Sequence, residues 1–174
     1  LLVPNTRPGH PLDNTMHLWF LWMLTWFAVL SAALVPLARR VPQVLRAHLS
    51  AVFVRVASSS WGVAVLALPL GLVGACYKEG FVTASGHFFA PWMEWVHNGL
   101  FFGFGLALYP HRRQLFALYQ LRWIAHALAG FTLYSVVMLG VSLARQGQLV
   151  IPYSAFWIAL LFNACSWLFG FSLI

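Results

Sequence analysis

Acidic side chains are almost absent from this sequence. Its 174 residues include three Asp and Glu, and charged residues of either sign make up only 7% of the chain. A soluble domain carries roughly 25% charged residues. Because 61% of the residues are hydrophobic, a water-soluble fold of this length cannot bury them. The composition therefore predicts an integral membrane protein rather than a soluble domain.

Several chemical signatures are missing as well. The cysteines, Cys76 and Cys165, form no Cys-x-x-Cys pair, and no group of residues has the spacing of a metal site. A disulfide between them is not expected, because one lies at a helix end and the other in the middle of a helix. The run Ser58-Ser59-Ser60 lies outside any Gly-x-Ser-x-Gly elbow, which excludes that type of serine hydrolase.

The net charge of +7 comes from ten Lys and Arg against three acids. In a soluble protein such an excess would suggest a nucleic-acid partner. Here the bases gather in short connections between apolar segments, which is the pattern that orients membrane proteins. We therefore predict a lipid bilayer as the partner, and no nucleic acid.

Nearly uncharged apolar segments recur along the chain. Each is long enough, at 1.5 Å per residue, to cross a hydrocarbon core of about 30 Å. The expected fold is all-α and polytopic, with membrane helices at about 17–38, 51–75, 92–109, 123–144 and 152–174.

Proline and glycine positions refine this expectation. Pro69 and Gly71 are expected to bend the second helix. Gly99, Gly103 and Gly105 are expected to let the third helix approach a neighbour closely.

The basic residues predict an orientation. Residues 42–50 are expected to form a short basic connector or an interfacial helix, and residues 110–122 a loop. The connections at 39–50 and 110–122 carry Arg39, Arg40, Arg46, Arg112, Arg113 and Arg122, whereas the opposite side carries Arg7, Lys78 and Arg145. The richer side is expected to be cytoplasmic, with residues 76–91 outside. Since the sequence begins without Met and stops inside an apolar run, residues 1–174 are expected to be part of one domain, truncated at both ends.

Three ionisable side chains, His17, Glu94 and His97, lie at the outer ends of expected helices. Charges in lipid are costly unless they are paired or reach water, so such groups tend to face a cavity. Glu94 and His97 are one helical turn apart, and a carboxylate beside a histidine favours a general base. The alternative is that both lie at headgroup level, where the positive helix N-terminus favours Glu94. For His17 the alternative is an interfacial anchor.

Arg55, Arg112 and Arg113 lie toward the expected cytoplasmic side. Arginine recognises phosphate through two parallel hydrogen bonds. The alternative is that these residues only orient the chain and contact anionic lipids. His126 and Asn163 are expected to form hydrogen bonds between helices rather than to bind a ligand.

Residues 14–22, Asn-Thr-Met-His-Leu-Trp-Phe-Leu-Trp, resemble the opening of a middle helix in the acyltransferase-3 family. These are bacterial inner-membrane enzymes that acylate extracytoplasmic carbohydrates, and the nearest subgroup is that of the glucan-biosynthesis succinyltransferases. Residues 98–105, followed by His111-Arg112-Arg113, are similar to a later helix and basic loop of those proteins.

This resemblance implies transfer of an acetyl, succinyl or similar group from a cytoplasmic acyl-CoA to a hydroxyl of an extracytoplasmic glycan. It implies acyl-CoA as a co-substrate without a bound cofactor, and phosphate contacts at Arg55, Arg112 and Arg113. The candidate catalytic residues, His17, Glu94 and His97, follow from their positions at the helix ends and are not carried over from the family. The family's essential histidine, with its upstream arginine, has no counterpart here, so the chain alone is expected to be inactive. The other functions considered are a transporter or channel fragment and a non-catalytic membrane scaffold.

Overall fold

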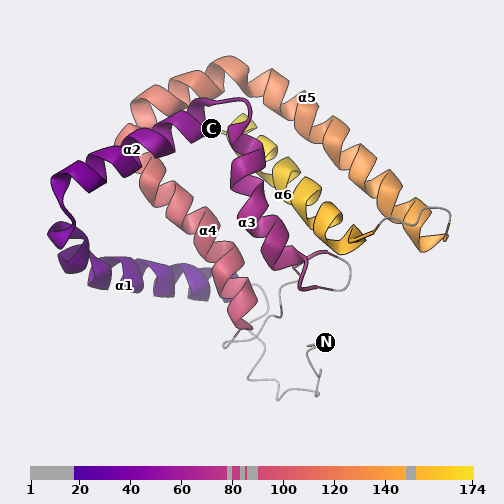
Figure 1. Cartoon of the computed structure of the whole chain (residues 1–174), viewed down its shortest axis with the longest axis horizontal. Coiled ribbons are helices and arrows are strands. Elements are labelled where there is room, and N and C mark those ends of the chain that lie inside the picture. The colour runs from indigo at the N-terminus through magenta and orange to yellow at the C-terminus, as the bar shows by residue number, and fades with distance from the viewer. Residues whose placement is uncertain (1–17, 78–79, 83–84, 86–89, 148–151) are drawn as a thin grey trace.

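The computed structural model describes residues 18–77, 80–82, 85, 90–147 and 152–174, and this part of the chain is helical without a strand (Figure 1). Its elements in chain order are α1 (Trp19–Arg40), α2 (Gln43–Ser58), α3 (Gly62–Gly74), α4 (Trp92–Leu108), the 3-10 turn η3 (Tyr109–His111), α5 (Arg112–Arg145) and α6 (Ser154–Ser172). The expected all-α class is confirmed.

α1 is apolar around its whole circumference, and little of it is covered. Only Met23 is buried, whereas Leu30 and Leu37 are among its many exposed apolar side chains. α1, the stretch Trp92–Arg145 and α6 are each long and apolar enough to cross a membrane, and the pair α2–α3 makes a fourth candidate if it counts as one span. A helix that is hydrophobic all round needs lipid or protein around it, so these helices are compatible with a multi-pass membrane protein.

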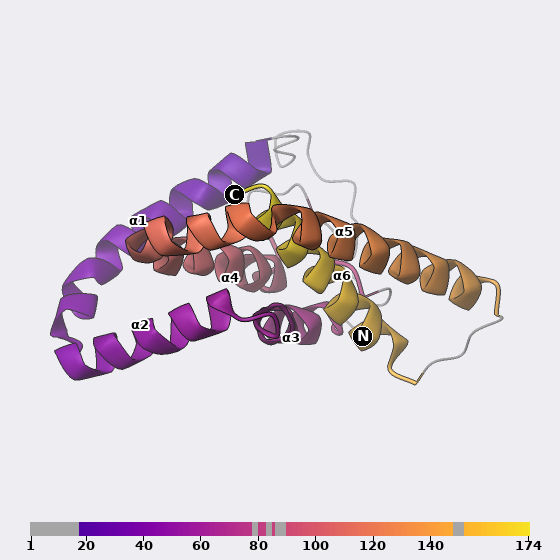
Figure 2. The ribbon, with the colours of Figure 1, turned by 90° about the horizontal axis from the view of Figure 1, so that it is seen from above.

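The best-packed part of the molecule is formed by α3, α5 and α6, which lie side by side in Figures 1 and 2. Small residues let these helices approach closely. A Cβ placed on Gly71 would lie 3.1 Å from the Cα of Leu160, and one on Gly74 would lie 2.5 Å from the Cβ of Ala159. A Cβ placed on Gly130 would lie 3.3 Å from Leu168 and from Phe169 in α6.

The expectation for the glycines of the third helix is wrong for two of the three. No atom of the described residues beyond α4 itself lies within 4 Å of a Cβ placed on Gly103 or Gly105. Gly99 does lie against a neighbour, the ring of Phe27 in α1, at 3.4 Å.

The second expected helix, 51–75, is wrong as a continuous element. One helix, α2, ends at Ser58 and the next, α3, begins at Gly62, with a bend of 102° between them. The bend therefore lies at the serine run and not at Pro69 and Gly71, which are both inside α3. Serine hydroxyls compete for backbone groups and favour helix ends. A Cβ on Gly62 would lie 1.8 Å from the carbonyl oxygen of Val56, so the turn requires glycine.

The loop expected at 110–122 is also wrong. Tyr109–His111 form a 3-10 turn, and α5 begins at Arg112. Arginine is a good helix former, and Leu115 and Tyr119 bury one face of this segment at helical spacing. Its arginines lie on a helix that extends through the expected fourth span. The helices expected at 92–109 and 152–174 are confirmed within two residues at each end as α4 and α6.

Two contacts show which ends of the helices lie together. The hydroxyl of Ser50 is 2.8 Å from Nε2 of His111, which joins the two basic segments. At the other end of α4, the ring of Trp95 lies 5.4 Å from that of Phe27 in the first half of α1. Figure 2 shows α1 and α2 diverging from their shared turn, with α4 between them.

Candidate functional site

A buried carboxyl group lies in the first turn of α4. Pro91 precedes the helix, and Glu94 occupies its third position with only 2% of its surface exposed. Its Oε1 accepts a hydrogen bond of 3.0 Å from the backbone N–H of Ser85. Its Oε2 is buried and has no hydrogen-bond partner among the described residues. Such an orphaned oxygen is costly in a native protein and often marks a functional site.

His97 lies one turn further along α4 and contacts α6. Its Nε2 is 3.0 Å from Oδ1 of Asn163. The amide nitrogen of Asn163 donates to the carbonyl of Ala159 at 2.8 Å, which fixes the orientation of the amide. The oxygen that faces His97 can only accept, so Nε2 of His97 must donate. The neutral ring then has its lone pair on Nδ1, and this atom can accept a proton.

Two further side chains, Asn98 and Tyr77, lie near Glu94. Asn98 donates to the carbonyl of Glu94 at 2.8 Å and contacts the sulfur of Met23 in α1 at 3.6 Å. Tyr77, just after α3, has its pKa raised by burial, and the negative charge of Glu94 raises it further. Tyr77 therefore remains a neutral hydroxyl at physiological pH, close enough to Glu94 to sense its charge.

The expected catalytic residues are therefore brought together only in part. Glu94 and His97 share one face of α4, but the ring bonds to Asn163 and the carboxylate to Ser85. The expected direct pairing of the two is not formed in the described structure. His17 lies outside the described residues.

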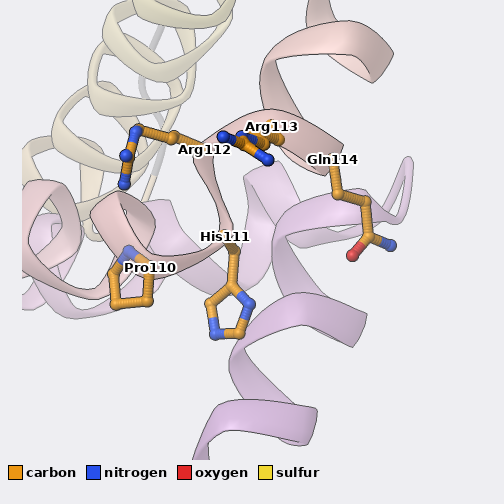
Figure 3. A pocket seen from close by; sticks show the side chains of 5 residues that line it. All are labelled: Pro110, His111, Arg112, Arg113 and Gln114. Carbon is orange, nitrogen blue, oxygen red and sulfur yellow. The ribbon is translucent and has the colours of Figure 1, made fainter.

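The expected phosphate-binding arginines are not gathered into one cluster. Arg112 and Arg113 line a cavity of about 380 Å³ at the junction of η3 and α5. Figure 3 shows their side chains pointing in different directions, with Arg112 on the side of Pro110. Arg112 donates to the carbonyl of Tyr109 at 3.0 Å and lies 4.2 Å from the centre of that ring.

Arg55 lies elsewhere, in the last turn of α2 rather than near the start of a span. It is exposed and does not line this cavity. A cation in this position is favoured by the negative helix C-terminus, which explains the arginine without a ligand.

The role of Asn163 is the one that the sequence predicts best, because a lone amide inside an uncharged segment is expected to form a hydrogen bond between helices. The expected interhelical hydrogen bond of Asn163 is confirmed. For His126 it is not formed: the Nδ1 of its ring is buried without a partner in the part of the chain that the structure describes.

The sequence does not predict Ser85 or Tyr77 at the site, and no pattern around them points to it. The described residues also place no three His, Cys, Asp or Glu side chains together as a metal would require.

No protein-family model, curated protein or solved structure matches this chain.

Proposed function

We propose that this chain forms part of a membrane acyltransferase of the acyltransferase-3 type in a bacterial inner membrane. It moves an acyl group such as acetyl or succinyl from a cytoplasmic acyl-CoA to a hydroxyl of an extracytoplasmic glycan. The supporting observation is the His97 ring, held by Asn163 with Nδ1 left to accept a proton, one turn from the buried carboxyl of Glu94. The sequence resemblance at residues 14–22, 98–105 and 111–113 supplies the reaction class.

The proposed chemistry uses these atoms in order. Nδ1 of His97 takes the proton of the acceptor hydroxyl, whose oxygen attacks the thioester carbonyl. A carbon–oxygen bond forms, the carbon–sulfur bond breaks, and the proton passes to the departing thiolate. The charge of Glu94 stabilises the imidazolium that forms in between. His17 helps to place the same acceptor hydroxyl.

The donor has to reach this end of α4 from the other. Glu94 and Arg112 are separated by a helical stretch of about 27 Å at 1.5 Å per residue, which is close to the thickness of the hydrocarbon core. In the proposal, Arg112 and Arg113 bind the phosphates of acyl-CoA at the cytoplasmic end, with Arg55 on the same side. The acyl-bearing arm then extends along α4 toward His97.

The proposal includes five crossings. The helical stretch Trp92–Arg145 is 54 residues long, or about 81 Å, so it exceeds a hydrocarbon core of about 30 Å more than twofold. We assign α4 and α5 to separate crossings, because Figure 1 shows the chain changing direction between them. With α1, the bent pair α2–α3 and α6, the total is five.

The test is acyl transfer from labelled acyl-CoA to glycan in membranes that contain the protein. His97→Gln keeps a polar side chain at this position and adds no charge, and it should lower the rate by roughly 10²–10⁴ through loss of the base. Gly103→Ala, a change at an uncrowded position of the same helix, should leave the rate unchanged. His17→Gln should fall in the same range as His97→Gln, with membrane abundance unaltered. A loss of less than about threefold in both histidine variants would remove the catalytic role.

A transporter is the second candidate, and the 102° bend between α2 and α3 favours it. Transporters use broken helices to build sites within the membrane. The two functions are separated by product: a transferase leaves label covalently attached to the glycan, whereas a transporter moves unmodified solute without an acyl donor. A scaffold would tolerate loss of His17, Glu94 and Arg55 with assembly intact.

A further inference from the structure

The break between α2 and α3 is held by side chains at each of the last carbonyls of α2. The hydroxyls of Ser58 and Ser59 donate to the carbonyls of Arg55 and Val56 at 3.4 and 2.8 Å. Two further donors come from α5. Because the last carbonyls of a helix have no partner within it, this complete set of donors indicates a built feature of the fold.

α5 contributes the remaining donors. Tyr119 donates its hydroxyl to the carbonyl of Ala57 at 2.9 Å, and Arg122 donates to the carbonyl of Ser58 at 3.3 Å. The partial negative charge at the end of α2 is thereby offset. The positive N-terminus of α3 begins at the same break, and such helix ends attract anions.

A cavity of about 700 Å³ opens at this break. Its lining combines serine hydroxyls with the side chains of Arg122 and His126 and with apolar groups that include Leu168 and Phe171. Its volume is in the range of about 300–1,000 Å³ typical of small-molecule sites. A mixed polar and apolar lining suits a ligand that has both a charged head and a hydrocarbon tail.

Two polar side chains at the cavity, His126 and Arg122, have hydrogen-bonding groups that the described residues do not use. The Nδ1 of His126 is buried without a hydrogen bond from the described residues. Arg122 has several N–H donors besides the one used on Ser58. The sequence has three acids, and Glu94, the one acid in the described ranges, is in the first turn of α4 with its carboxylate bonded to Ser85. Arg122 therefore has no carboxylate partner among the described residues.

We propose that this cavity binds an acylated phosphate. Arg122 and His126, one turn apart on α5, bind the phosphate oxygens together with the hydroxyl of Ser60, and the acyl chain lies along Leu168 and Phe171. A phosphate fits this set better than a carboxylate, because it offers more oxygens to donors that come from several directions. The ligand comes either from an anionic phospholipid of the bilayer or from an acyl-CoA. Phosphate binding here does not depend on the proposed acyl transfer.

The test measures binding of a radiolabelled short-chain lysophosphatidic acid to the protein in neutral detergent. Monoacylglycerol with the same chain lacks the phosphate, and the matching fatty acid replaces it with a carboxylate. Lysophosphatidic acid should bind about tenfold or more tightly than either one. If monoacylglycerol or the fatty acid bound as tightly as lysophosphatidic acid, the proposal would be overturned, because the phosphate would then contribute nothing specific.

Variants locate the site. Arg122→Gln should weaken binding about tenfold or more, and His126→Phe, which keeps the aromatic contacts, by several-fold. Arg46→Gln removes the same charge from an exposed position at the far end of α2 and should change affinity by less than about twofold. Equal effects of Arg122→Gln and Arg46→Gln would overturn the site.

Since Arg122 also supports the break, a second variant leaves that contact intact. Ala129→Phe adds a ring to the cavity lining and retains the Arg122 and His126 side chains, and it should reduce binding as strongly while gel filtration and circular dichroism stay unchanged. Undiminished binding in this folded variant would overturn the proposal. Competition by acyl-CoA and by phosphatidylglycerol of the same chain length then decides the source: the competitor that displaces the probe at the lower concentration identifies the ligand as thioester donor or as bilayer phospholipid.

Discussion

Glu94 is buried at a free-energy cost that its position at a helix N-terminus does not fully explain. Its carboxylate is 2% exposed and leaves Oε2 without a partner among the described residues. The N-terminus of α4 favours negative charge nearby, but a helix cap alone would not require both oxygens to be buried. A substrate hydroxyl or a proton that passes through the site would give the second oxygen a partner.

The variant Glu94→Gln separates these two roles. Glutamine keeps the acceptor for the Ser85 N–H and the size of the side chain, so we expect the free energy of unfolding to change by less than about 1 kcal/mol. The charge is lost, so the rate of acyl transfer should fall at least about tenfold. Both quantities are measured on the same membrane preparation. Full activity in Glu94→Gln would leave only the capping role.

The pairing of His97 with Asn163 shows how far residue patterns carry. Helical spacing correctly places Glu94 and His97 on one face of a helix. It cannot show that the ring turns toward α6, because that contact joins residues 66 positions apart in the chain. The polarity of Asn163 in an apolar segment predicts an interhelical hydrogen bond, whereas its partner, His97, is visible only in the fold.

At the level of the helix, the prediction that a cluster of arginines lies outside the helices is wrong for residues 110–122. The arginines at 112, 113 and 122 predict a loop, but they lie on α5, which runs on to Arg145. The serine run at 58–60 carried the opposite signal, since it interrupts an apolar segment and does end a helix. Long apolar helices are therefore well predicted, whereas their breaks and extensions depend on side-chain contacts that the sequence does not show.

The close contact of α3 with α6 predicts a specific sensitivity. Gly74→Val adds carbon atoms at a position where even a single added Cβ would lie 2.5 Å from the Cβ of Ala159 and 2.9 Å from the carbonyl oxygen of Gly80. Overpacking of this kind costs about 1–3 kcal/mol. Gly103→Val is the matched control in an uncrowded position. Unfolding in detergent mixtures measures both, and equal stability of the two variants would contradict the packing.

The break at Ser58 predicts a second effect at this scale. Tyr119→Phe removes the hydroxyl that donates to the carbonyl of Ala57 at 2.9 Å. A buried carbonyl left without a donor costs about 1–3 kcal/mol. Tyr134→Phe removes a hydroxyl for which no hydrogen bond is formed within the described structure, and it serves as the control. A loss of stability confined to Tyr119→Phe, measured by the same unfolding transition, is the expected result.

For the molecule as a whole, the distribution of bases and the contacts at the helix ends agree. The hydrogen bond between Ser50 and His111 places the two arginine-rich segments at one end. At the other end, Gly80 packs against the start of α6, and Tyr77 just after α3 lies near Glu94 in the first turn of α4. Positive-inside bias and helix packing are independent sources of information, so their agreement makes the orientation testable at single positions.

The native cysteines make that test convenient, because Cys76 is exposed and Cys165 is buried. We expect residues 39–50 and 110–122 to face the cytoplasm and 76–91 the exterior. With Cys165 replaced by Ala, an impermeant maleimide added to intact cells should label Cys76. With both native cysteines replaced, Gln43→Cys should be labelled only after the membrane is opened. Each variant is labelled before and after lysis, so that poor reactivity is not mistaken for a cytoplasmic position. Strong labelling of Gln43→Cys in intact cells would invert the orientation and move Glu94 and His97 to the cytoplasmic side, away from an extracytoplasmic acceptor.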